Sequence, residues 1–405
     1  MHVSLDSALG RQRRLNSVGE SVLQIAPNAA AAYSLRSLTG GDPKVVRVRR
    51  GSNNVESDFT ASGVSSGALL DFVTTSQIGW NVQPTFSNAA GTGSITSQSS
   101  TATTATVSFT GEASLIRETS KPNHVLGSSG DQVIFNISVS GLDSAGTLRL
   151  RTSGTNTTVG SSSVSNGDNQ DITLNLTGSA GYLAMTFVAS SGGTITFNSI
   201  TVLPKSGFVE TWYDQSGNSE DAVQETSGSQ PLIVSAGALV ANGLDFDGSD
   251  DKLNIPNDLI ASINSASSFL VAKSDTVSSS RIALALSHST SNFRFYVGAL
   301  LSSKFYFGYQ DTALKIELSA ADTNKHLFTS IAGSSNTEAF LDGTSKGTVS
   351  SVDGKSTLSS GGIGSINTGN FWSGTIQEVI VYNTDQSANR VALETNIQTA
   401  YPTLP

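Results

Sequence analysis

The stretch TWYDQSGN, residues 211–218, carries the densest local pattern in the chain, and it is followed by QPLIV at 230–234 and NGLDFDGSDDKL at 242–253. Trp212 and Tyr213 bring a large apolar surface with polar tips to this stretch. Asp, Ser, Gly and Asn follow at once, and these are the residues that favour turns. On both sides, short segments that alternate apolar and polar residues recur along the chain, which indicates a protein built mostly of strands.

Two acidic patterns in this region suggest either cation binding or turns. Asp214, Ser216 and Asn218 are spaced i, i+2, i+4, and oxygen ligands at that spacing can wrap a hard cation such as calcium. The alternative is a structural turn in which Asp214 and Asn218 bond to nearby backbone amides. A second acidic cluster is interpreted as the solvated rim of a turn; it consists of Asp247, Asp250 and Asp251.

Composition excludes several classes of protein. Charged residues make up 14% of the 405 residues, and Lys plus Arg 23 against Asp plus Glu 32 gives a net charge of −9. Helical bundles favour long charged side chains on their surfaces, and duplex nucleic acid requires clustered cations, so neither is expected. The chain has no Cys, which excludes disulfides, thiolate metal sites and a cysteine nucleophile. No apolar run approaches the roughly 20 residues of a membrane span.

A composition change at about residue 75 suggests an inserted domain that extends to about 206. This segment is dominated by Ser, Thr, Gly and Asn, and its strand-like pieces occur at regular spacing, which is typical of an antiparallel sandwich. Their alternation predicts that one set of side chains faces a core: Phe135, Ile137, Val139, Ile172, Leu174 and Leu176.

The segments on either side predict more strands and two helices. From 207 to the end the strand-like pieces contain more aromatic residues. Residues 27–38 are predicted to form a helix, because Ala31, Leu35 and Leu38 fall on one face of a 3.6-residue period. Leu393, Ile397, Ala400 and Tyr401 share such a face, which predicts a second helix before Pro402. Val46 and Val48 alternate with Arg47 and Arg49, which predicts a strand with one basic face.

The order of several motifs resembles a known module. AAYSLRSL (31–38), VRVRRGSNNVESDFT (46–60) and TWYDQSGN are together similar to a laminin-G/concanavalin-like module of bacteriophage structural proteins. This opening half also resembles the catalytic domain of α-L-arabinofuranosidases. The closing parts EAFLDGTSKG (338–347) and FWSGTIQEVIVYNTDQSANR (371–390) resemble the end of a laminin-G-like sandwich. The insert is similar to the jelly rolls of carbohydrate-binding modules.

The resemblance does not carry over an active site. The arabinofuranosidase family places its carboxylates in later segments that include a vicinal cysteine pair, and this chain has no matching segment and no Cys. A glycosidase needs two carboxylates about 5–9.5 Å apart. The sequence places none of its candidates together, namely Asp214, Asp247, Glu338 and Asp342. No catalytic residue is assigned, and the chain is expected not to be an enzyme, with a glycoside hydrolase as the alternative.

We therefore expect a mostly β protein: a concanavalin/laminin-G-like sandwich (27–74 and 207–405), an inserted β-sandwich of jelly-roll type (75–206), and short helices near the ends. Residues 1–26 are expected to form an arm that attaches the protein to a virion. The residues expected to dock on partners are Arg11, Arg13, Arg14, Arg47 and Arg49.

The expected function is structural or adhesive. The resemblance implies a virion component, either a head decoration, a fibre or a tail part, with other virion proteins as partners and a homo-oligomer such as a trimer as its state. Host-surface polysaccharide is a further candidate partner, and Trp212, Tyr213 and Trp372 are the candidate glycan platforms. No nucleic acid, no membrane and no cofactor is expected, with calcium at Asp214, Ser216 and Asn218 as the one candidate ion.

Overall fold

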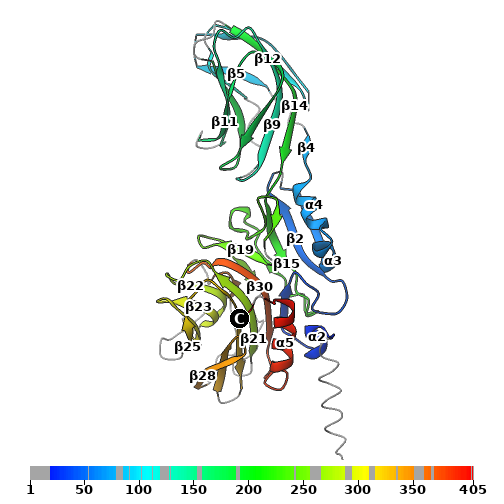
Figure 1. The fold of residues 1–405 in the computed structure, drawn as a ribbon, viewed down its shortest axis with the longest axis vertical. Coiled ribbons are helices and arrows are strands. Elements are labelled where there is room, and N and C mark those ends of the chain that lie inside the picture. Colours follow the sequence, from blue (N-terminus) through cyan, green and yellow to red (C-terminus); the bar gives the residue numbers. More distant parts are fainter. Residues whose placement is uncertain are drawn as a thin grey trace, which may run out of the picture.

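The chain forms two β-sandwiches, one inserted into the other (Figure 1). The computed structural model describes residues 19–405 except for 53, 79–84, 91, 102, 112, 119–126, 128, 153–156, 188–191, 241–242, 256–265, 288–293, 310–314, 334–335, 351–359, 366–368, 403 and 405. We call the two modules the main sandwich and the insert. The prediction of a mostly β protein with a few short helices is confirmed.

The main sandwich uses the chain on both sides of the insert. Before the insert it contains α2 (Val22–Ile25), β1 (Ala31–Ser34), β2 (Lys44–Arg50), β3 (Glu56–Thr60), α3 (Ala61–Ser65) and α4 (Ala68–Thr74). After the insert it contains β15 (Gly207–Trp212), β16 (Ala222–Val223), the 3₁₀ turn η1 (Ser227–Ser229), β17 (Leu232–Ser235), β18 (Ala238–Leu239), β19 (Leu244–Asp247), β20 (Leu253–Ile255), β21 (Ser267–Ser274), β22 (Arg281–Ser287), β23 (Arg294–Leu301), β24 (Lys304–Tyr309), β25 (Lys315–Ala320), β26 (Lys325–Ala332), β27 (Asn336–Leu341), β28 (Thr344–Ser350), β29 (Ser360–Ile363), β30 (Ser373–Tyr382) and α5 (Arg390–Ala400).

Strand β30 is the centre of this module. It pairs with β21 on one side and with β19 and β1 in succession on the other, and β21 continues the sheet through β26, β27 and β28. A second layer runs β20–β29–β22–β23–β24–β25 and joins the first through β16 and β15. All these pairs are antiparallel.

Both faces of the β30 sheet are buried, which explains its apolar sequence. On β21, Leu270 and Ala272 belong to the large core between the layers. Phe269 and Val271 point the other way, into a smaller core with Leu393 of α5. Strands that are covered on both faces read as apolar runs rather than as an alternation. Helix α5 therefore closes the outer face of the sheet, and the prediction of a C-terminal helix is confirmed.

The insert is a second sandwich with a core of its own. Its strands are β4 (Gln77–Ile78), β5 (Phe86–Ala90), β6 (Ser94–Ser100), β7 (Ala105–Thr110), β8 (Ala113–Glu118), β9 (Gln132–Ser140), β10 (Gly146–Arg151), β11 (Thr158–Val164), β12 (Gly167–Asn175), β13 (Tyr182–Phe187) and β14 (Gly192–Leu203). They form the sheets β11-β10-β13-β8-β5 and β12-β9-β14-β7-β6. The side chains predicted to face inward are in or against this core.

Hydrogen bonds at 205–206 tie the insert to the main sandwich. The amide of Lys205 donates to the buried Asp131 Oδ1 at 2.7 Å, and Ser206 Oγ donates to the Ser129 carbonyl at 3.2 Å. On the other side the Gly51 amide donates to the Ser206 carbonyl at 3.0 Å. Among the described residues, no helix is long and apolar enough to cross a bilayer.

The predicted helix over 27–38 is wrong. Residues Ala31–Ser34 form β1, which pairs with β30, and all four are buried. Ala31 and Tyr33 belong to the large core, and Ala32 belongs to the smaller core on the other face of the sheet. A short buried strand and a short buried helix have similar apolar runs, so periodicity could not separate them. The helices α3 and α4, which lie just before the insert, were not predicted.

A buried ion pair joins the segment after β1 to β30. Arg36 Nε and Nη2 donate to the two carboxylate oxygens of Glu378 at 2.7 and 2.8 Å. Glu378 lies on β30 and is fully buried, and the hydroxyl of Tyr401 also donates to it at 3.2 Å. The Glu378 carboxylate raises the pKa of Arg36 although burial opposes this. Arg36 therefore stays charged and compensates a carboxylate that has no access to water.

Glu378→Gln is predicted to lower the free energy of unfolding by about 3 kcal/mol, because it leaves the Arg36 charge without its partner. Urea denaturation of the full chain measures this. The matched control is Lys304→Gln, which removes the exposed Lys304–Glu317 pair and is expected to leave the midpoint unchanged. Equal midpoints for wild type and Glu378→Gln would show that the ion pair contributes nothing.

Candidate functional site

The Asp214 carboxylate is saturated by hydrogen bonds from the protein. Its Oδ1 accepts from the amides of Ala32 (2.8 Å) and Ser216 (2.9 Å). Its Oδ2 accepts from Ser216 Oγ (2.6 Å) and the Glu220 amide (3.2 Å). These four bonds use the lone pairs that a cation would need. The structure therefore favours the turn interpretation, and calcium binding at Asp214, Ser216 and Asn218 stays a prediction.

The neighbouring amide side chains bind the same distant segment. Gln215 is buried, and its Nε2 donates to the Ser34 and Arg36 carbonyls at 2.9 and 3.0 Å while its Oε1 accepts from the Leu38 amide at 2.7 Å. Asn218 Nδ2 donates to the carbonyls of Ala29 and Ala30 at 2.9 and 3.0 Å. We call Asp214, Gln215 and Asn218 with their bonds to residues 29–38 the 214–218 clamp.

The three predicted glycan platforms lie in different environments. Trp212 and Trp372 are fully buried in the main core, so neither offers a face to a ligand, and their prediction as platforms is corrected. Tyr213 is half-buried, and its hydroxyl donates to Asp58 Oδ1 at 2.7 Å. Burial raises the pKa of Tyr213, and the Asp58 carboxylate adds to this. Tyr213 is thus part of a surface network and is not brought together with the two tryptophans.

The two predicted docking arginines that the structure describes, Arg47 and Arg49, both form contacts within the fold. Arg47 forms an ion pair with Asp58, with Nε 2.7 Å from Oδ1. Arg49 is buried, donates to Gln230 Oε1 at 2.6 Å and stacks on Phe208. Arg49 therefore presents no charge to a partner, which corrects its assignment. The remaining three, Arg11, Arg13 and Arg14, lie outside the described residues, as does most of the predicted arm.

A groove of about 710 Å³ lies where the segment after β1, helix α3, strand β18 and the end of α5 meet. Leu35, Val64 and Leu239 contribute apolar walls. Arg36 and Asp42 contribute charges at its edge. Its volume falls within the range of ligand pockets, roughly 300–1,000 Å³. Sequence analysis did not find this groove, because four segments far apart in the chain build it.

The polar groups of the groove are held in place. Asp42 Oδ1 accepts from the Ser62 amide at 2.8 Å, and Oδ2 accepts from Ser62 Oγ at 2.6 Å. These bonds lower the pKa of Asp42, so the carboxylate is ionised and acts as an acceptor at neutral pH. Arg36 is oriented by its two bonds to Glu378, which do not use Nη1. The groove therefore presents a fixed acceptor, a fixed donor and an apolar wall.

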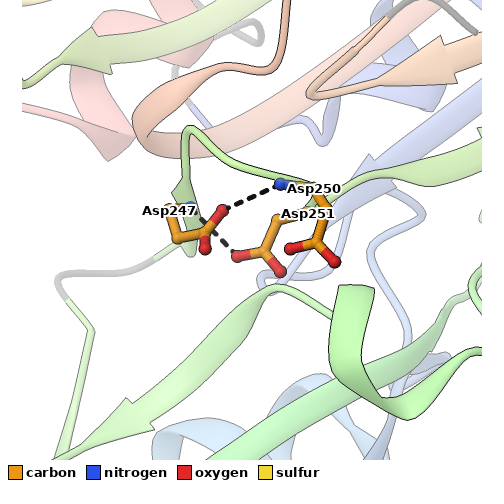
Figure 2. Close-up of side chains that lie close together, drawn as sticks. All are labelled: Asp247, Asp250 and Asp251. Carbon is orange, nitrogen blue, oxygen red and sulfur yellow. Dashed lines mark hydrogen bonds between the residues drawn. The ribbon is translucent and has the colours of Figure 1, made fainter. Parts of the chain in front are cut away.

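A cluster of three carboxylates forms at the turn after β19 (Figure 2). Asp247 Oδ1 accepts from the amides of Ser249 and Asp250 at 2.7 and 3.3 Å, and the Asp247 amide donates to Asp251 Oδ2 at 2.9 Å. Carboxylate oxygens of all three residues lie within 4.8 Å of one another. Among the described residues this is the acidic group that could hold a hard cation such as calcium or magnesium.

Asp251 is the buried member of this cluster. Its pKa is raised to about 7: burial and the charges of Asp247, Asp250 and Asp245 raise it, and the hydrogen bond from the Asp247 amide partly offsets them. The expected solvated rim is therefore correct for Asp247 and Asp250, which are exposed, and wrong for Asp251, which is 7% exposed. The turn folds back so that Asp251 Oδ2 accepts the hydrogen bond from the Asp247 amide, and this position buries the Asp251 side chain.

Sequence analysis also missed a histidine between two carboxylates. His326 is buried on β26, with Nδ1 2.6 Å from Asp342 Oδ2 and Nε2 2.9 Å from Asp322 Oδ1. Burial lowers the pKa of His326, but the two carboxylates outweigh it and the net pKa is raised. Asp342 lies in the turn between β27 and β28 and also accepts from the Leu327 amide, so the group joins that turn to the start of β26. No local sequence pattern links residues 322, 326 and 342.

Comparisons with known proteins found distant likenesses among solved structures. No family model matches the chain, and no curated protein matches it. Among solved structures it is similar to domain 4 of AbnA, a GH43 extracellular arabinanase from Geobacillus stearothermophilus in complex with arabinotriose, at 12% identity over 45% of this chain and 91% of that one, with a TM-score of 0.37.

Two other structures are similar at the same low level. The botulinum neurotoxin serotype D binding domain is 13% identical, over 47% of this chain and 48% of that one, with a TM-score of 0.35. Trypanosoma rangeli sialidase in complex with sialic acid is 11% identical, over 73% of this chain and 61% of that one, with a TM-score of 0.37. The chain thus spans half to three fifths of these two proteins, and likenesses this distant carry no argument about function.

Asp251→Asn is predicted to remove a pH dependence of stability. The pKa of about 7 in the folded chain lies above the roughly 3.9 of an unfolded Asp. The folded state therefore holds this proton more tightly, and its contribution to stability is lost as pH rises from about 4 through about 7. The variant keeps an oxygen for the Asp247 amide and lacks the charge, so its advantage over wild type is expected to grow toward pH 8.

Urea denaturation at pH 5 and pH 8 measures this advantage, which we expect to rise by at least about 1 kcal/mol between them. Asp168→Asn, at an exposed position of the insert, is the control and is expected to show no such rise. If the curves of wild type and Asp251→Asn ran parallel over this range, the buried charge would not be the cause.

Proposed function

We propose that this chain is a non-catalytic glycan-binding protein and that the groove beside Arg36 and Asp42 is its binding site. One observation carries the proposal: a groove of ligand size combines an apolar wall with a fixed acceptor and a fixed donor. A sugar ring has an apolar face of C–H groups and a rim of hydroxyls that both donate and accept. Such a ring would lie against Leu239 and Val64 and hydrogen-bond to Asp42 and Arg36.

The same residues favour binding over hydrolysis. A glycosidase needs one carboxyl group that keeps a proton and a second carboxylate across the scissile bond. Asp42 is the carboxylate that lines the groove, and hydrogen bonds from Ser62 stabilise its ionised form. Glu378, which lies behind Arg36, is engaged in the ion pair. Neither carboxylate is suited to donate a proton. We therefore propose glycan binding without hydrolysis, and a glycoside hydrolase is the alternative.

Binding is predicted to depend on the shape and charge of the groove. A panel of neutral glucan, mannan, galactan and arabinan oligosaccharides is titrated by calorimetry against the full chain. Leu239→Trp, which fills the groove, and Asp42→Asn, which removes the charged acceptor, are each expected to weaken the best ligand at least about tenfold. Val277→Trp adds the same bulk at an exposed position outside the groove and is expected to bind as wild type does.

Three outcomes separate the alternatives. Binding that both groove variants weaken supports the proposal. Binding that is unchanged in Leu239→Trp, or no binding to any member of the panel, contradicts it. Release of reducing sugar by wild type and not by Asp42→Asn would favour the hydrolase.

We propose further that the protein is a component of a bacteriophage particle, with residues 1–26 as its attachment arm. This rests on the motif order around AAYSLRSL, TWYDQSGN and the closing segment, together with Arg11, Arg13 and Arg14 in an otherwise acidic chain. Deletion of residues 2–26 is predicted to abolish incorporation into particles while the purified chain still folds. Particles that carry the shortened protein at full copy number would contradict the attachment role.

A further inference from the structure

The insert carries a basic sheet face in an otherwise acidic chain. Its five cationic residues are at positions 117, 121, 149, 151 and 205. Two of them, Arg149 and Arg151, are on β10, and strand register places Arg117 of β8 in the row of Arg149, since both pair with Ala184 of β13. The insert also has six acidic residues, at positions 112, 118, 131, 143, 168 and 171. Of these, Glu118 follows Arg117 on β8, and Asp168 and Asp171 lie on β12, in the other sheet.

Strand alternation assigns Arg149 and Arg151 to the outer face of their sheet. Leu148 and Leu150 of β10 are buried in the core of the insert, and successive side chains point to opposite faces. Arg149 and Arg151 are partly exposed, in keeping with an outward direction. Neighbouring residues on one face of a strand lie about 7 Å apart. Arg149 and Arg151 therefore place two positive charges side by side on this face, as a small array.

Two details of the hydrogen bonding bear on how these arginines would bind a ligand oxygen. Arg149 Nη1 donates to Thr186 Oγ1 at 2.6 Å, which orients one guanidinium across β10 and β13. Arg151 Nε is buried and has no hydrogen-bond partner in the part of the chain that the structure describes. A buried donor without an acceptor is costly, and a ligand oxygen would remove that cost once the Arg151 side chain turns outward.

We infer that the outer face of β10 and β13 binds a polysaccharide that carries carboxylate or sulfate groups. Planar guanidinium groups bind such anions through two parallel hydrogen bonds. The hydroxyls of Thr147 and Thr186, which pair across the two strands, lie in the next row and can bond to sugar hydroxyls. This site lies in the insert and is separate from the groove beside Arg36 and Asp42 in the main sandwich, for which neutral glycans are the proposed ligands.

A nucleic acid fits this face less well. Binding of single strands uses exposed aromatic side chains on which bases stack. Tyr182, the aromatic residue of β13 that pairs with Arg151, is 1% exposed and offers no such platform.

The experiment measures binding of the full chain to three immobilised polymers: polygalacturonate as the carboxylated probe, dextran sulfate as the sulfated probe and dextran as the neutral one. We expect either polygalacturonate or dextran sulfate to bind at this face, and dextran not to bind there. Removing either charge by Arg149→Gln or Arg151→Gln is expected to weaken binding about tenfold, and the double variant more. Binding is also expected to weaken between 50 and 500 mM salt, because salt screens the charges.

Controls separate this site from stability and from the groove. Arg149→Lys and Arg151→Lys retain the charge and lose the two-pronged geometry, so an intermediate affinity is expected. Lys346→Gln makes the same charge change on the exposed surface of the main sandwich and should bind as wild type does. Leu239→Trp, which blocks the groove, should also leave this binding intact.

Each remaining outcome contradicts the inference. These are equal binding to dextran, binding unchanged in the double Gln variant, or tighter binding to a single-stranded oligonucleotide than to either charged polysaccharide. If the double Gln variant has a lower melting temperature than wild type, the double variant with Arg149→Lys and Arg151→Lys is tested instead. Unchanged affinity of that variant would also refute the two-pronged contact.

Discussion

The hydrogen bonds of the 214–218 clamp are the constraint on which the main sandwich depends. The chain leaves this module after α4 at Thr74 and returns at β15, so residues 29–38 and 211–218 must meet across the whole insert. Backbone pairing of β15 with β2 brings the segments together, and the side chains of Asp214, Gln215 and Asn218 fasten β1 and the residues after it. Because the insert is itself folded, closing this long connection costs less than closing a flexible loop would.

The strands and the C-terminal helix followed from sequence because each has a regular apolar period. Segments such as 132–140 of the insert and 373–382 of the main sandwich alternate or run apolar over their full length, and both are strands. The 27–38 segment was wrongly predicted as a helix because β1 is buried on both faces, which gives an apolar run without the two-residue period of a strand. Trp212 and Trp372 misled for a different reason: sequence reports an aromatic residue, whereas its exposure depends on which layer covers it.

Much less of the candidate site was predictable. The groove is made by residues at 35–42, 61–65, 239–240 and 400–401, and no local pattern indicates that these four segments converge. The same is true of His326, whose two carboxylate neighbours come from different turns. The acidic turn at 247–251 was visible as a cluster, but the burial of Asp251 within it depends on how the turn folds back on β19. Local sequence patterns thus do not indicate which distant segments of the chain meet in the fold.

The two surfaces proposed to bind ligands differ in their chemistry. The groove of the main sandwich combines an apolar wall with one donor and one acceptor, whereas the insert presents arginines on a flat sheet. If both surfaces bind as proposed, two weak sites on one chain would raise its effective affinity for a surface that displays both ligands, without any new contact. Each module has a core of its own, and the chain has no Cys and hence no disulfide.

Hydrogen exchange in Gln215→Met tests the clamp most directly. This variant keeps the bulk of the side chain and removes its three bonds to Ser34, Arg36 and Leu38. If the clamp holds the two chain segments together, peptides covering residues 31–38 will exchange faster than in wild type, although they lie far from position 215 in sequence. Faster exchange confined to the peptides around 215, with residues 31–38 protected as before, would contradict the account.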